Sequence, residues 1–143
     1  MSRPGGCGAL LLRASARLVA GALLATGLAR CGPSISDQVE RLGGTPDERQ
    51  QARQELLLAK DQAVTPLLKA LADPRRAAAR GELADVLFSL MARVEDPRIL
   101  PALLDRLATD ADPDVRARIA YLVALHRIPQ AADALLAGLL AGA

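Results

Sequence analysis

The chain has 143 residues, and 51% of them are hydrophobic, with leucine and alanine far more common than the single tyrosine and single phenylalanine. This composition favours helices, because leucine and alanine lose least conformational entropy on entering one, and it argues against a strand-rich fold, because the residues that favour strands are scarce. The net charge of +2 comes from the first thirty residues, which hold four arginines and no acid. The remainder carries 14 basic and 16 acidic residues and gives no electrostatic basis for binding nucleic acid.

Residues 1–30 have the pattern of a secretory signal peptide. Arginines precede an uncharged apolar run, LVAGALLATGLA (18–29), whose 12 residues are fewer than the roughly 20 that a membrane-spanning helix needs. Basic residues followed by such a run are typical of an export signal. We predict that residues 1–30 are removed and that the protein is exported to the periplasm or cell envelope. The alternatives are a buried core helix or an intracellular scaffold that keeps this segment.

The sequence GLARCGPS (27–34) follows this run. It resembles the lipobox of bacterial lipoproteins, in which the cysteine becomes the lipidated first residue. The resemblance implies lipidation of Cys31, a short tether over residues 31–35, and contact with a membrane through the lipid alone. Arg30 stands where that family has a small residue. Ordinary cleavage near residues 25–27 is therefore the alternative, with Cys31 free or in an intermolecular disulfide.

A repeat with a period of 36 residues runs through the rest of the chain. The sequence VTPLLKALA (64–72) aligns with LPALLDRLA (100–108), and the same offset carries Leu103 and Leu104 onto Leu139 and Leu140. Apolar residues within each period recur at the i, i+3, i+4, i+7 spacing of a helix. This pattern predicts helices at about 36–42, 46–59, 62–72, 75–91, 97–108, 113–126 and 129–140.

The predicted helix starts share a local signal, a capping residue followed by proline. Thr45, Asp73, Asp96 and Asp112 each precede a proline. A threonine or aspartate at the N-cap accepts a hydrogen bond from an early backbone N–H of the helix. Proline at the next position loses no hydrogen bond, because an N–H there would have no partner within the helix.

The sequence DPDVRARIAYLVAL (112–125) carries these features together and resembles bacterial HEAT repeats. The resemblance implies an all-α fold over residues 36–143, a short armadillo-like α-solenoid of stacked antiparallel helix pairs with about three repeats. In that family an aspartate and an arginine link neighbouring repeats. These positions fall on Asp112 and on Arg80 and Arg116. Because Arg76 replaces the aspartate 36 residues earlier, we expect an incomplete ladder.

Three carboxylates, Asp110, Asp112 and Asp114, stand in the spacing of a calcium-binding loop. Such a loop also needs glycine at its sixth place and glutamate at its twelfth, where this chain has Val115 and Tyr121. We therefore interpret Asp112 as a helix cap and Asp114 as a charge favoured at a helix N-terminus, and we assign no role to Asp110.

Other signals of chemistry are weak. His126 is the single histidine, and no cysteine follows Cys31 to complete a zinc site; we expect His126 to cover a helix C-terminus. The basic run DPRRAAAR (73–80) could favour DNA. The chain has only one phenylalanine and one tyrosine, however, too few for the base stacking by which proteins bind single strands or extruded bases. We predict no catalytic residue, no cofactor, no metal and no nucleic-acid partner.

The last predicted helix, within AADALLAGLLAGA (131–143), has no following helix to cover its leucines. We expect this end to dock a partner, a second copy or a longer native context, or else to fray. Together these features predict a non-catalytic protein–protein interaction scaffold or adaptor that is exported and, where Cys31 is modified, lipid-anchored. The alternative is an accessory or lyase-like subunit that handles a partner protein or its prosthetic group.

Overall fold

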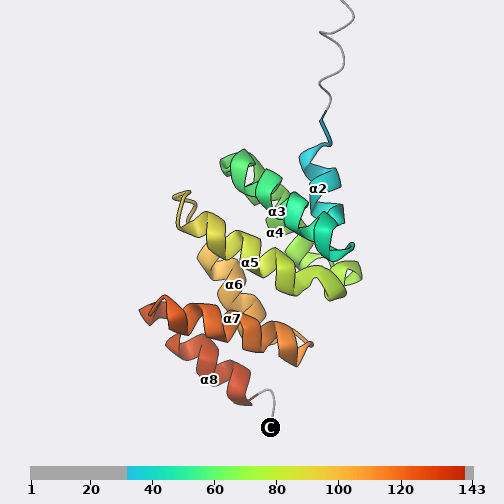
Figure 1. The fold of residues 1–143 in the computed structure, drawn as a ribbon. Helices are drawn as coiled ribbons and strands as arrows, with labels where there is room; N and C mark the ends of the chain where they lie inside the picture. Colours follow the sequence, from blue (N-terminus) through green and yellow to red (C-terminus); the bar gives the residue numbers. More distant parts are fainter. Residues whose placement is uncertain (1–31, 141–143) are drawn as a thin grey trace, which may run out of the picture. The chain divides into compact units, whose positions relative to one another are not determined.

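The computed structural model describes residues 32–140. The predicted signal peptide and Cys31 lie outside these residues. Every regular element within residues 32–140 is helical, which confirms the predicted all-α class. Figure 1 shows the elements, which in chain order are α2 (Ile35–Arg41), α3 (Pro46–Ala59), α4 (Asp61–Ala72), η1 (Pro74–Ala79), α5 (Arg80–Met91), α6 (Ile99–Thr109), α7 (Pro113–Leu125), η2 (Pro129–Ala131) and α8 (Ala132–Leu140).

Reciprocal caps begin α2 and α3. At α3, the Thr45 Oγ1 accepts a hydrogen bond from the Glu48 backbone N–H, and the Glu48 carboxylate accepts one from the Thr45 N–H at 2.8 Å. The hydrogen bond from the Thr45 backbone lowers the pKa of Glu48. Ser34 and Asp37 form the same arrangement at α2. These local contacts explain why the sequence predicted the start of α3 correctly.

Three helices begin later in the chain than the sequence predicted. The region predicted as one helix over 75–91 begins as the 3-10 helix η1, where Arg76 has non-helical angles, and α5 starts only at Arg80. Asp96 does not cap α6, which begins at Ile99. Its carboxylate instead accepts hydrogen bonds from the backbone and guanidinium of Arg98, which keeps the chain in a turn before the helix. Proline at 129 likewise begins η2 rather than α8.

The helices pack in two rows. The first row consists of α3, α5 and α7, which contact one another in that order; the second row consists of α2, α4, α6 and α8. Helices that follow each other in the chain also pack across the rows, as α2 does on α3, α4 on α5 and α6 on α7. Short connections between such neighbours make them antiparallel.

The hydrophobic core lies where the two rows meet. Its aliphatic side chains come from both rows, and α5 contributes the largest share of buried residues. Its largest fully buried side chains are those of Leu42, Leu56, Leu67, Leu71, Leu83, Leu87, Leu90, Ile99, Leu103, Ile119, Val64 and Val86. Among residues 32–140, no helix combines the length and apolar character needed to cross a membrane.

Gly138 allows α8 to approach α6 closely. A Cβ atom at Gly138 would lie 2.9 Å from the Leu107 carbonyl oxygen, whereas one at Gly81 would meet only the Arg118 side chain, at 3.4 Å or more.

Alanine in a helix interior is more stable than glycine by about 1 kcal/mol, but overpacking costs about 1–3 kcal/mol. We predict that Gly138→Ala lowers the free energy of unfolding measured with urea, whereas the matched control Gly81→Ala leaves it equal or higher. Equal stabilisation by both changes would contradict this packing.

Candidate functional site

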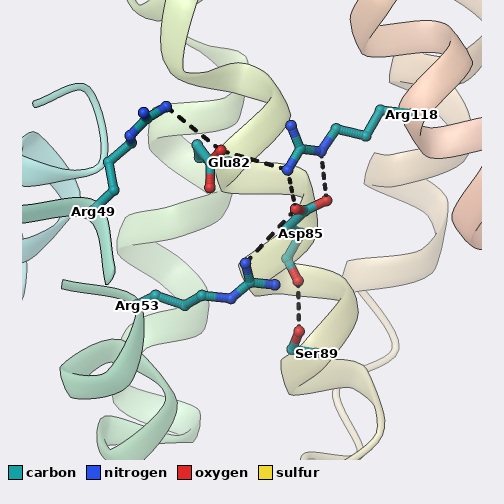
Figure 2. A network of polar contacts seen from close by, with 6 residues as sticks. All are labelled: Arg49, Arg53, Glu82, Asp85, Ser89 and Arg118. Atoms are coloured by element: carbon teal, nitrogen blue, oxygen red, sulfur yellow. Dashed lines mark hydrogen bonds and ion pairs between the residues drawn. The ribbon is translucent and has the colours of Figure 1, made fainter. Parts of the chain in front are cut away.

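A network of charged side chains crosses the three helices of the first row. Figure 2 shows Arg49 and Arg53 reaching from α3, and Arg118 from α7, toward Glu82 and Asp85 on the central helix α5. Because the two carboxylates are three residues apart, they lie on one face of α5. The network therefore places three guanidinium groups around two carboxylates, and we call it the arginine network.

Arg118 forms the closest contacts of the arginine network. Its Nε donates to Asp85 Oδ1 at 2.9 Å, and its Nη2 donates to the other Asp85 oxygen and, at 3.4 Å, to Glu82. The hydrogen bond to Asp85 is the main cause that raises the pKa of Arg118. The Arg118 side chain passes beside Gly81, where a Cβ would lie 3.4 Å from it, an ordinary van der Waals contact. This bidentate pair fixes α7 on α5.

Arg49 and Arg53 are held more loosely. Arg49 Nη1 lies 3.7 Å from Glu82 Oε1, and Arg53 Nη1 lies 3.8 Å from Asp85 Oδ2. Both distances are those of ion pairs, too long for hydrogen bonds. Both side chains are about one-third exposed and border a shallow groove of about 250 Å³ that Glu82 and Arg118 also line. Both guanidinium groups thus border a groove that solvent or another molecule can fill, and they keep N–H donors that no hydrogen bond within residues 32–140 uses.

A second ion pair, between Arg80 and Asp110, is buried. Arg80 Nη1 donates to both carboxylate oxygens of Asp110, at 2.9 and 3.0 Å, and the two side chains are 9% and 0% exposed. The Arg80 Nε has no hydrogen-bond partner within residues 32–140. This pair connects the start of α5 to the link between α6 and α7.

Asp110 is the residue that sequence reasoning missed. Its Oδ1 accepts the Asp112 N–H at 3.0 Å, and its carbonyl oxygen accepts a bond from Arg116 Nη1 at 2.6 Å. Arg80 and Arg116 thus both bind Asp110, although only Asp112 had been assigned to such a link. The Asp112 carboxylate caps α7, as predicted, by accepting the Asp114 N–H at 2.9 Å.

Two turns share the sequence Asp-Pro-Arg and one geometry. In each, the aspartate accepts bonds from the arginine backbone and from two guanidinium nitrogens, between Asp73 and Arg75 and between Asp96 and Arg98. These bonds, the side-chain bond first, lower the pKa of Asp96 to about 2. Both carboxylates remain ionised at neutral pH and act as turn anchors rather than as proton acceptors.

A wider groove of about 500 Å³ lies in the second row, bordered by α2, α4 and η1. Val39, Pro66 and Ala70 contribute apolar surface, and an ion pair between Arg76 and Glu40 stands at its edge.

Among residues 32–140, no group of three or more histidine, cysteine or acidic side chains could hold a metal ion. His126 is the C-cap of α7, with its ring 5.0 Å from that of Phe88.

The sequence did hold a signal for the arginine network. Arg118 follows Glu82 by 36 residues, the repeat offset, so opposite charges occupy the same position on neighbouring helices of the first row.

Comparison with protein-family models gives no match, and neither curated proteins nor solved structures show a significant similarity to the chain.

The buried pair gives a stability prediction. Removing one partner of a buried ion pair leaves an uncompensated charge, which costs about 3–5 kcal/mol; loss of an N-cap costs about 1 kcal/mol. We predict that Asp110→Asn lowers the free energy of unfolding well below that of the control Asp112→Ala, measured by urea denaturation.

The double variant Arg80→Met with Asp110→Asn tests the pairing itself. Its loss should be smaller than the sum of the two single losses, because it removes both charges. Additive losses, or equal effects of Asp110→Asn and Asp112→Ala, would refute the assigned role of Asp110.

Proposed function

We propose that this protein is a non-catalytic interaction scaffold built as a short HEAT-like α-solenoid. Two observations support the solenoid. Alternate helices contact one another in two rows, and residues 36 apart, such as Leu67 and Leu103, are both fully buried. Stacked helix pairs of this kind bury a continuous core and leave the outward faces of both rows for partners.

The loosely held guanidinium groups of Arg49 and Arg53 are the observation that carries the proposed binding role. They border an open groove, and neither forms a hydrogen bond within residues 32–140. Glu82 and Asp85 hold them in place without occupying their donors. Arginine is enriched among the residues that dominate protein interfaces, and its planar group suits a carboxylate.

The partner we propose is a protein with a short acidic segment. Three guanidinium groups and two carboxylates give the arginine network a single net positive charge. Asp47 and Asp114 add negative charge to the first turns of α3 and α7, the helices that supply the three arginines. A carboxylate or two from a partner fits such a surface, whereas a polyanion such as nucleic acid would meet these acids.

Loss of the two loosely held arginines tests this role. We expect the full chain and its Arg93→Gln control to retain the same partner from an envelope extract, and the double variant Arg49→Gln with Arg53→Gln to lose it. Arg118 still binds Asp85 and Glu82 in this variant, and partly exposed ion pairs contribute only about 0–1 kcal/mol to stability. The variant should therefore remain folded. Free hexaglutamate should release the partner and hexalysine should not. Equal retention by all three proteins, or no retained protein, would contradict the proposal.

We further propose that residues 1–30 export the protein and that Cys31 receives a lipid, which tethers residues 31–35 and the helical domain to a membrane surface. The basic residues, the apolar run and the lipobox-like sequence around Cys31 support this. The helical domain would then meet partners in the cell envelope.

Intact-mass measurement of the protein from membranes tests this proposal. We expect a chain that begins at Cys31 and carries a diacylglyceryl group. A chain beginning near Leu28 would exclude the anchor, and a chain that keeps Met1 would exclude export. The control variant Cys31→Ser should lose both the lipid mass and the membrane association.

A further inference from the structure

The helix α8 carries an uncovered continuation of the core. Leu67, Leu103 and Leu139 occupy the same position in helices α4, α6 and α8, 36 residues apart. The first two are 0% exposed, whereas Leu139 is 72% exposed. Leu136 and Leu140 are exposed as well, and no residue of α8 is fully buried. The position that is core in two helices of the second row is therefore surface in the third.

The surroundings of α6 show what kind of element such a position requires. Within residues 32–140, α6 contacts α4, α5, α7 and α8, and α7 runs antiparallel to it after a link of three residues. The principal helix contact of α8 is α6, against which Gly138 packs. An antiparallel apolar helix on the open side of α8 would reproduce the environment of Leu103.

We propose that a second copy of this chain supplies that helix, so that two α8 helices pair about a two-fold axis. A two-fold axis perpendicular to α8 makes the paired helices antiparallel, which is the direction that α7 takes on α6. It also places the same apolar patch on both sides of the contact, as isologous dimers do. This self-association goes beyond partner binding and rests on the packing of α8, not on the arginine network.

The charges favour this pairing over head-to-tail stacking. The one charged residue of α8 is Asp133, near its start. Antiparallel pairing about the middle of the helix separates the two copies of Asp133 by about 10 Å along the axis, about the distance over which salt screens charges. At the other end of the second row, α2 exposes Ser36, Asp37 and Glu40. With the Arg76–Glu40 ion pair beside the groove there, these polar residues make that end a less apolar surface for α8 than a second α8 is.

Sedimentation equilibrium of the full chain tests the dimer. We expect the wild-type chain and the control Leu58→Glu, which changes an equally exposed leucine on α3, to reach twice the monomer mass. Leu139→Glu should raise the dissociation constant at least tenfold. A monomeric wild-type chain would overturn the proposal, and so would association that Leu139→Glu leaves unchanged, which would place the contact elsewhere, such as in the apolar run of residues 18–29.

A cysteine cross-link checks the geometry independently of any loss of folding in Leu139→Glu. Leu136 lies at the middle of α8, so the two-fold axis brings its two copies together. In a chain with Cys7→Ser and Cys31→Ser, we expect Leu136→Cys to form a disulfide-linked dimer under mild oxidation and the control Leu58→Cys to remain monomeric. Equal cross-linking of both variants, or none of Leu136→Cys, would refute the antiparallel pairing.

Discussion

A helix of this chain cannot cover its own stripe of leucines, so every helix depends on the next one. Burying one leucine contributes about 1.5–3 kcal/mol, and an isolated helix of this length is marginal in water. The stripe repeats every 36 residues, which brings Leu67 and Leu103 into one core between the two rows. The same dependence leaves the last helix, α8, with leucines that nothing within residues 32–140 covers.

The polar groups join helices that the leucines have already brought together. Asp85 is nearly buried, and its charge is tolerable because Arg118 binds it through two nitrogens and Arg53 lies nearby. The exposed members of the arginine network add little to the free energy of folding. Their effect is positional, because Glu82 and Asp85 hold Arg49 and Arg53 at the edge of a groove. Stability thus resides mainly between the rows, whereas the proposed interaction surface is the groove beside Arg49 and Arg53.

The sequence predicted those features that depend on neighbouring residues. The α3 boundaries were correct because the Thr45 cap acts within four residues, and the buried stripe follows from the spacing of leucines alone. The role of Asp110 could not be predicted from neighbouring residues. Its partner Arg80 is 30 residues away in the sequence and is brought near only by packing of the helices. The predicted start of α6 was too early for a local reason that the sequence does contain. An arginine two residues after Asp96 binds the carboxylate that was expected to cap the helix.

The two proposed surfaces lie on different rows and so can act together. Pairing through α8 uses the second row and leaves the groove beside Arg49 and Arg53 open in each copy. A dimer would then present two identical basic grooves to one partner. Binding at the second groove becomes intramolecular, which raises avidity without any new contact when the partner carries two acidic segments at a suitable spacing. A weak individual site, with one net positive charge, would be sufficient in such an assembly.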